Sequence, residues 1–501
     1  MKYGSISTGS KEASNTALEI LKFGGNAFDA AIGAIFVSMT SEFALTGAFG
    51  GGTLLGIQNN SSPFIYDFFV DCPNCQTNDK KDFKEIEIDF GNAKQKFNIG
   101  KGSIAIPGNL IGLINIQKKY GCLDIKDILE YGINYANQGI VINKNQSEII
   151  KLIEPILLFD KAGQELYSNN NSIMKEGDIF KNPQFANFLN TVIKKGYKYF
   201  YEGSGLDLIL SHCGKDSFLT KNGFQKYQVK KRVPLAINYK GYEIFTNPAP
   251  SFGGSLIIFL LKLLKDTNNK INVKNLIQSM NLASLVREEI CTNPNDEYQI
   301  NNIFNDNVYN KYLNFSANNF ADNLNGFGST THVSVLDKNG NAASITTTNG
   351  EGCGYVIPEY GIMMNNMLGE EDLNPFGFHK WDIKRRLPTM ISPTIISKNN
   401  IPEYVLGSGG SNRIRSANIQ VILNLIEKNM NLNDAIENPR IHLEGKELYC
   451  EPGIKINSEE IINQLSLKLF KEKNVFFGGV NAVSKTEAIG DSRRGGCGII
   501  N

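Results

Sequence analysis

Apolar residues recur at helical spacing near the start of the chain, with polar residues between them. From residue 11 to residue 23 this spacing predicts a helix that follows the N-cap candidate Ser10 and stops at Gly24 and Gly25. The same reasoning predicts further helices at residues 27–39, at residues 109–120 and from residue 256 onward.

Glycine is concentrated between residues 46 and 53, directly before the apolar run at residues 54–57, which predicts a strand. A glycine cluster can bind phosphate, but this one lacks the Gly-Lys-Ser/Thr ending of a P-loop and precedes a strand instead of a helix. We therefore interpret it as a place of close backbone packing, for which residues without a Cβ are suited.

The middle of the chain is expected to be mainly helical, from residue 121 to about residue 280. An Asn- and Asp-rich stretch at residues 292–325 has few apolar residues and no periodicity, which is typical of a linker. No internal repeat is evident.

A β-hairpin is predicted at residues 330–348. Apolar and polar residues alternate in both arms, and the residues between the arms are typical of a turn. Cross-strand packing favours the register that pairs Val333 with Ile345. This register places Thr330 directly opposite Thr348. Two hydroxyl groups about 5 Å apart at the start of a strand are a candidate for chemistry.

Composition and charge exclude several functional classes. The chain has 501 residues, of which 41% are hydrophobic and 20% charged, as in an ordinary folded protein. Its 51 Lys and Arg residues nearly balance its 50 Asp and Glu residues, so no net charge favours nucleic acid or anionic lipid. No apolar run reaches the roughly 18 residues that a membrane span needs. The start of the chain lacks the pattern of a secretory signal, so we expect a cytoplasmic protein.

Eight cysteines are scattered through the chain, and only Cys72 and Cys75 form a close pair. One CxxC without a second is a weak zinc signal. We therefore interpret the cysteines as thiols in a reducing compartment, and we predict neither a metal nor a cofactor.

One part of the chain has a specific resemblance. The run from Thr330 to Ala342 resembles the start of the small subunit of the γ-glutamyltranspeptidase family, whose members are N-terminal-nucleophile hydrolases. Six further motifs follow the family's order and extend the resemblance over essentially the whole chain. They lie at residues 21–31, 248–254, 361–366, 386–394, 407–414 and 490–496.

The resemblance implies a proenzyme that cuts its own backbone between Ser329 and Thr330. It implies an α/β (α+β) fold, a four-layer αββα sandwich built by both fragments. Residues 1–329 then form the large subunit and residues 330–501 the small subunit of one structural domain, although length alone favours about three domains. The two subunits of one precursor are the expected partners, and a homodimer of such pairs is a further hypothesis.

The resemblance also implies roles for single residues. After cleavage Thr330 carries the nucleophilic hydroxyl and a free α-amino group, whose ordinary pKa of about 7.7 to 8.0 suits a base. Thr348 matches the family's second threonine, which hydrogen-bonds the nucleophile. Gly409 and Gly410 match the pair whose backbone N–H groups bind the oxyanion. The resemblance gives His332 no catalytic role, and we interpret it as structural.

Two departures concern the groups that bind the charges of a γ-glutamyl substrate. Phe69 occupies the place of the family's carboxylate-binding arginine. After Asn366, Met367 replaces one ligand of the α-amino group and Glu370 conservatively replaces the other. Loss of a bidentate guanidinium leaves a buried carboxylate unpaired, at a cost of roughly 2 to 5 kcal/mol. We therefore predict that free glutathione binds badly.

Other positions complete the candidate substrate site. The family's paired serines near the oxyanion hole are matched by Pro388 and Thr389. The family's asparagine two residues after the second threonine is matched by Gly350, with Asn349 adjacent to it.

Three functional hypotheses remain open. The first is a self-processing amidase or acyltransferase for small-molecule amides, with an apolar acyl pocket. The second is a true γ-glutamyl hydrolase or transferase that binds glutamate through other residues. Arg385, Arg413 and Arg415 are candidates for that role, although we expect them in exposed salt bridges. The third is a non-catalytic scaffold, which the joint presence of Thr330 and Thr348 disfavours.

Overall fold

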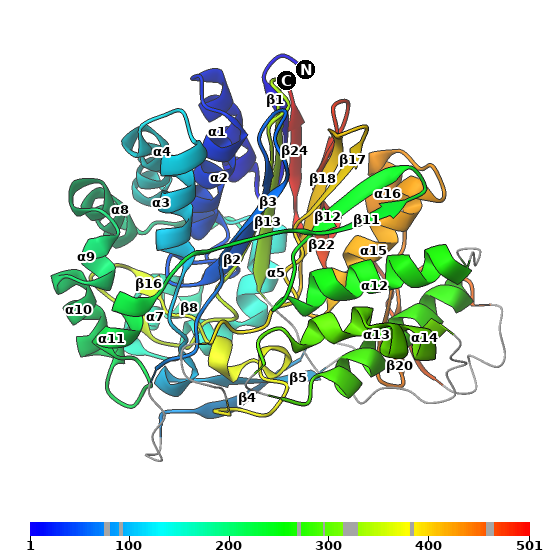
Figure 1. Cartoon of the computed structure of the whole chain (residues 1–501). Coiled ribbons are helices and arrows are strands. Elements are labelled where there is room, and N and C mark those ends of the chain that lie inside the picture. Colours follow the sequence, from blue (N-terminus) through cyan, green and yellow to red (C-terminus); the bar gives the residue numbers. More distant parts are fainter. Residues whose placement is uncertain are drawn as a thin grey trace.

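Two antiparallel β-sheets lie face to face at the centre of the molecule, and helices cover the outer side of each sheet (Figure 1). The structure, a computed structural model, describes residues 1–74, 81–89, 94–267, 272–293, 296–313, 329–380, 385–456 and 465–501. This arrangement of layers confirms the predicted αββα sandwich.

The first sheet has seven strands in the order β10-β3-β2-β14-β13-β1-β24. In that order they are Lys230–Arg232, Phe64–Phe68, Gly51–Ile57, Ala342–Thr348, Thr330–Asp337, Gly4–Thr8 and Cys497–Ile500. The second sheet has the order β11-β12-β17-β18-β22-β23. Its strands are Leu235–Tyr239, Tyr242–Thr246, Thr394–Lys398, Ile401–Gly409, Gly479–Val483 and Ala488–Ile489.

Helices α1 to α4 and α8 cover the first sheet, and α12, α13, α15 and α16 lie beside the second (Figure 1). The first group comprises Lys11–Lys22, Ala27–Ser41, Asn109–Tyr120, Ile125–Gln138 and Pro183–Lys195. The second group comprises Phe252–Thr267, Val273–Ile290, Arg413–Ile426 and Leu432–Glu437. Shorter helices are α5 Lys144–Leu152, α6 Glu154–Leu157, α7 Lys161–Tyr167, α9 Lys198–Tyr201, α10 Ser204–Cys213, α11 Lys221–Lys226 and α14 Asp306–Leu313.

Five small sheets are also present among the described residues, four of them two-stranded. The two-stranded sheets are formed by β4 Lys84–Asp89 with β5 Lys94–Ile99, β6 Ile140–Val141 with β9 Ile179–Phe180, β7 Ser168–Asn169 with β8 Ser172–Ile173, and β15 Val356–Ile357 with β16 Ile362–Met363. A three-stranded sheet joins β19 Ile441–Glu444, β20 Glu447–Cys450 and β21 Ser466–Leu469.

The helices predicted from periodicity are confirmed. The Ser10 hydroxyl accepts the Ala13 N–H at the start of α1, and α3 has the predicted bounds, Asn109–Tyr120. The second helix, α2, extends two residues beyond the predicted end and is buried along its whole length. Its N-terminus is fixed by a capping box between Asn26 and Asp29, which satisfies backbone donors that the helix leaves open.

Each central sheet contains strands from both sides of residue 330. In the first sheet, β13 and β14 lie between β2 and β1; in the second, β17 and β18 continue from β11 and β12. The two predicted subunits therefore share both sheets in this uncleaved chain. The division at residue 330 itself stays a prediction.

The glycine cluster before β2 packs tightly against its neighbours. A Cβ on Gly50 would collide with the carbonyl oxygen of Thr348, and a Cβ on Gly51 would lie 2.8 Å from the backbone nitrogen of Val70. Both observations agree with the interpretation of this cluster as close backbone packing.

Helices dominate the described residues of 121–280, as expected, although the short strands β6 to β12 lie among them. The expectation for the segment that follows needs correction. The expected linker at residues 292–325 includes a 3₁₀ helix, Gln299–Phe304, and α14. Ile303 and Tyr312 from this segment are buried against α12, so tertiary packing orders a polar sequence that has no periodicity of its own. Residues 314–328 lie outside the described residues.

Candidate active site

Thr330 and Thr348 lie at one end of the inner pair of strands. Thr330 opens β13 and stands opposite Thr348, the last residue of β14, while Val333 pairs with Ile345. The predicted hairpin register is therefore confirmed. Thr348 also pairs with Gly51 on β2, so both threonines belong to the interior of the first sheet and are almost fully buried.

The Thr348 hydroxyl donates a hydrogen bond to the carbonyl oxygen of Ser329, the residue just before Thr330. The same hydroxyl accepts the Gly350 N–H at 3.0 Å, which orients it. A hydroxyl donor on a carbonyl oxygen polarises that carbonyl and stabilises negative charge that develops on it. The geometry can therefore assist attack on the Ser329 carbonyl carbon.

Gly409 and Gly410 lie on the other side of Thr330, at the end of β18. A Cβ on Gly409 would collide with the Thr330 carbonyl oxygen, so only a glycine fits there. Arg494 donates to that same oxygen at 3.2 Å. Burial lowers the pKa of Arg494 to about 10, which leaves its guanidinium charged at neutral pH. The position of Arg494 beside the nucleophile was missed, although it lies in the resemblance motif at residues 490–496.

His332 lies between the two sheets. Its Nδ1 is 2.7 Å from the Thr346 hydroxyl, and its Nε2 is 2.9 Å from the Ser334 hydroxyl. Burial lowers the pKa of His332 to about 3, so the ring is neutral. Both nitrogens are engaged within the sheet, in agreement with a structural role.

Three buried acids surround the turn that follows β14. Glu351 accepts the Ser329 N–H at 3.1 Å, and its own N–H donates to Asn366 at 2.9 Å. Burial raises the pKa of Glu351 to about 8. Burial and the neighbouring carboxyl groups also raise the pKa of Glu370 and that of Asp372. Among the described residues, the Oε1 atom of Glu370 has no hydrogen-bond partner.

Glu351 was also missed by the sequence argument, which assigned no role to it. The available signal was an acidic residue placed three positions after Thr348, in a turn where Gly350 has φ of +62°. A Cβ on Gly350 would collide with Asn366 and Glu370, so the glycine lets these two side chains approach the turn.

Phe69 and Met367 lie in one buried apolar cluster. Each is at most 1% exposed. The cluster also contains Val70, Cys72, Ala105, Phe218, Leu368, Leu373, Leu387 and Ile391. Cys75, the partner of Cys72 in the CxxC pair, lies outside the described residues.

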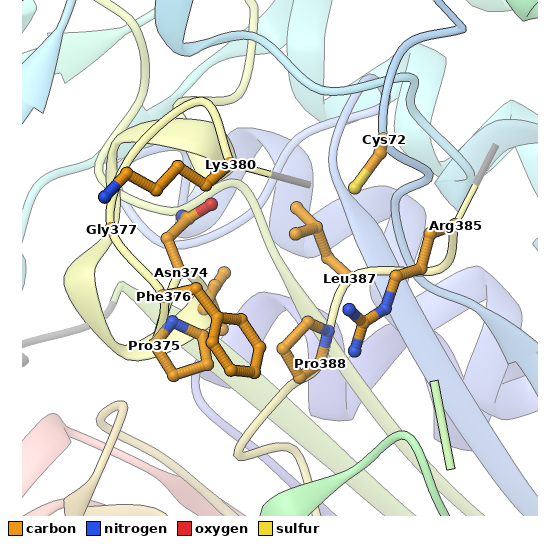
Figure 2. A pocket seen from close by; sticks show the side chains of 10 residues that line it. Cys72, Asn374, Pro375, Phe376, Gly377, Lys380, Arg385, Leu387 and Pro388 are labelled. Carbon is orange, nitrogen blue, oxygen red and sulfur yellow. The ribbon is translucent and has the colours of Figure 1, made fainter. Parts of the chain in front are cut away.

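A small pocket of about 20 Å³, open to solvent, borders this cluster (Figure 2). It is lined by Cys72, Leu373, Asn374, Pro375, Phe376, Gly377, Lys380, Arg385, Leu387 and Pro388. Of the predicted binding residues, Pro388 lines the pocket, whereas Phe69 and Met367 do not. The cluster reaches the pocket through Cys72, Leu373 and Leu387. Its charged lining residues, Lys380 and Arg385, are both basic.

Thr389 and Asn349 do not line this pocket. The Thr389 hydroxyl accepts the Ile391 N–H at 3.1 Å, and its carbonyl accepts the Phe252 N–H. The Asn349 side chain donates to the Met363 carbonyl at 3.1 Å and borders a different cavity, next to Phe43 and Phe185. Asn349 therefore faces the helical layer, away from the Thr348 hydroxyl.

The expectation of exposed salt bridges for Arg385, Arg413 and Arg415 is wrong. Each of them is at most 9% exposed. Arg413 lies over the ring of Phe476, and Arg415 donates to the Ser284 hydroxyl. Packing between α15 and its neighbours encloses these two side chains, and only Arg385 reaches the pocket.

None of the helices in the part of the chain that the structure describes is long and apolar enough to cross a membrane. Within the same part of the chain, no group of three or more His, Cys, Asp or Glu residues has the geometry to hold a metal ion.

Two facing sheets between helices, with a threonine opening an inner strand, define the architecture of an N-terminal-nucleophile hydrolase. The cephalosporin acylase of Bacillus halodurans has this fold, with a TM-score of 0.85 at 20% identity over 99% of this chain and 96% of its own. The sequence model of the family described as gamma-glutamyltranspeptidase matches residues 13–499. The chain therefore belongs to the γ-glutamyltranspeptidase family, and it is an enzyme of the hydrolase and transferase type.

Two relatives illustrate the range of this family. The capsule biosynthesis protein CapD proenzyme of Bacillus anthracis is 29% identical, over 99% of this chain and 90% of the relative. The glutathione hydrolase proenzyme of Bacillus subtilis is 28% identical, over 99% of this chain and 91% of the relative.

We predict that Glu351→Gln makes protein stability less dependent on pH. Glutamate has a pKa of 4.5 when exposed, whereas burial keeps Glu351 protonated up to about pH 8. The folded state binds more protons between these values, so the wild-type free energy of unfolding falls as pH rises through this window. The amide removes that contribution. As pH rises through this window, the melting temperature of Glu351→Gln should therefore fall less than that of the wild type. An equal fall in both proteins contradicts the raised pKa of Glu351.

Proposed function

We propose that this enzyme is a self-processing amidohydrolase or acyltransferase with Thr330 as its N-terminal nucleophile. The observation that carries the proposal is the hydrogen bond from Thr348 to the Ser329 carbonyl, because it activates the one peptide bond whose cleavage frees the Thr330 amino group. The relatives' names, which include the word proenzyme, support a precursor that is cut.

The cleavage is an acyl shift followed by hydrolysis. The Thr330 hydroxyl oxygen attacks the Ser329 carbonyl carbon, the C–N bond breaks, and the hydroxyl proton ends on the Thr330 nitrogen. Water then hydrolyses the ester, which leaves a carboxyl group on Ser329 and a free hydroxyl on Thr330. The products are the proposed large subunit, residues 1–329, and the small subunit, residues 330–501.

Substrate turnover uses the same atoms. The free α-amino group of Thr330 serves as the base for its hydroxyl, which attacks the substrate amide and forms an acyl-enzyme. Thr348 orients the nucleophile, and the backbone of Gly409 and Gly410 stabilises the oxyanion. Water or an amine then accepts the acyl group.

The apolar wall supports an acyl group without an amino-acid zwitterion. Phe69 and Met367 offer no charge where the family has charged or polar ligands, so a desolvated zwitterion lacks its partners there. One observation favours the second candidate, a true γ-glutamyl enzyme: Arg385 lines the pocket and could pair with a carboxylate.

The first prediction of this proposal is spontaneous cleavage between Ser329 and Thr330. Division of 55.5 kDa by residue count gives fragments of about 36 and 19 kDa. Thr330→Ala should stay whole, whereas Thr330→Ser keeps a hydroxyl and should still cleave. Intact-mass measurement during incubation at neutral pH checks this. A wild-type chain that remains single would contradict the nucleophile assignment.

The second prediction compares two adjacent threonines. Thr348→Val removes the hydroxyl on the Ser329 carbonyl, so cleavage and turnover should fall by about 10- to 1000-fold. Thr347→Val is the matched control, because the Thr347 hydroxyl is hydrogen-bonded to the Thr46 hydroxyl at 2.8 Å and not to Ser329. It should cleave and turn over near the wild-type rate. Equal effects in the two variants would mean that the Thr348 pairing is only structural.

The third prediction concerns the acyl group. Plain or aromatic acyl amides should exceed glutathione and γ-glutamyl anilides by at least about tenfold in kcat/KM, or some 1.4 kcal/mol in the transition state. Phe69→Arg combined with Met367→Glu should shift the preference back. Arg385→Leu separates the candidates, because it should abolish γ-glutamyl turnover only if Arg385 binds the carboxylate. Efficient glutathione cleavage by the wild type would favour the γ-glutamyl candidate.

A further inference from the structure

The carbonyl and the N–H of Ser329 are both hydrogen-bonded to side chains at the end of β14 and in the turn after it. Its carbonyl accepts from the Thr348 hydroxyl, and its N–H donates to Glu351 Oε1 at 3.1 Å. Thr348 and Glu351 are three residues apart, on either side of the tight turn at Gly350. Ser329 itself is fully buried, so no water replaces these two contacts from outside.

The Glu351 carboxyl is itself fixed by Asn366. The Glu351 N–H donates to Asn366 Oδ1 at 2.9 Å, and Asn366 Nδ2 lies 3.5 Å from Glu351 Oε2. Asn366 Nδ2 also lies 3.4 Å from the Asn98 carbonyl. The side chain that holds Ser329 is therefore part of a network that includes β5 and the segment before Met367.

We propose that Glu351 is a positioning residue for self-cleavage: it fixes the peptide of Ser329 so that its carbonyl carbon stays in reach of the Thr330 hydroxyl. The inference rests on the cleavage proposed above. Glu351 exchanges no atoms in the acyl shift; it restricts the rotation of the residue that carries the attacked carbonyl. Restriction of this kind lowers the entropic part of a barrier.

The pH dependence of the cleavage rate distinguishes a positioning role of Glu351 from a merely structural one. Burial raises the pKa of Glu351 to about 8, and the titratable groups that face it are Glu370 and Asp372. Below that pH the neutral carboxyl accepts the Ser329 N–H. Above it, the carboxyl group of Glu351 becomes a buried charge beside those acids, which disfavours the arrangement.

The test follows the cleavage rate of the full-length chain in Glu351→Gln and Glu351→Leu. The amide still accepts the Ser329 N–H, so Glu351→Gln should cleave within about threefold of the wild type at neutral pH and keep its rate above pH 8, where the wild type slows relative to it. Glu351→Leu should cleave at least about tenfold more slowly. The melting temperature of each variant verifies that it is folded.

Asp160 provides a matched control. The Asp160 carboxyl accepts the N–H of Val356, the first residue of β15, at 3.2 Å. This contact also fixes the chain after β14, but it does not involve Ser329. Asp160→Asn and Asp160→Leu should therefore cleave near the wild-type rate.

The outcomes separate this inference from the proposed function. If the wild type cleaves and Glu351→Leu cleaves equally fast, the inference is overturned while self-cleavage stands. Superimposable pH profiles of the wild type and Glu351→Gln also overturn it, even if the leucine variant does not fold. A wild type that never cleaves contradicts the proposed function and the inference together.

Discussion

The register between β13 and β14 is the constraint on which the site depends. A slip of one residue would turn the Thr348 side chain to the opposite face of the sheet and remove its hydroxyl from the Ser329 carbonyl. The register is fixed well away from the site, by the apolar pair of Val333 and Ile345. It is also fixed from both sides, because β14 pairs with β2 and β13 pairs with β1. Core packing thus determines the geometry of a polar site.

The buried acids near Ser329, which are Glu351, Glu370 and Asp372, lower the stability of the fold unless their carboxyl groups are compensated. Asp372 is compensated, since Ser411 and Asn412 donate to its carboxyl group. Glu351 binds a backbone N–H, but Glu370 keeps an oxygen without a hydrogen-bond partner among the described residues. Desolvation raises the pKa values of Glu351 and Glu370. Strongly shifted acids gathered at one peptide are typical of an active site rather than of a structural core.

Local patterns predicted what depends on local contacts. The bounds of α3 and the Thr330–Thr348 pairing follow from periodicity and cross-strand packing within one hairpin or helix. The resemblance supplied the layers of the fold. Glu351 and Arg494 could not be found in the same way, because their importance comes from contacts with Ser329 and Thr330, and Arg494 is 164 residues from Thr330 in the chain. The order in residues 296–313 likewise depends on burial against α12.

The neighbouring residues Arg385 and Arg386 point to opposite sides of one backbone segment and have different surroundings. The Arg386 guanidinium donates to the Phe69 carbonyl and lies 3.1 Å from Asp71. Burial raises the pKa of Asp67, but Arg386 and Arg232 more than offset this and keep it below its ordinary value. The charge of Arg386 is thus compensated within the protein, and it fixes the backbone that carries the apolar wall. Residues 385 and 387 form backbone hydrogen bonds with the chain at 70–72, so adjacent side chains point to opposite sides. Arg385 therefore faces the pocket, where the described lining holds no acid to neutralise it, and a substrate anion that entered there would meet a guanidinium beside a hydrophobic wall.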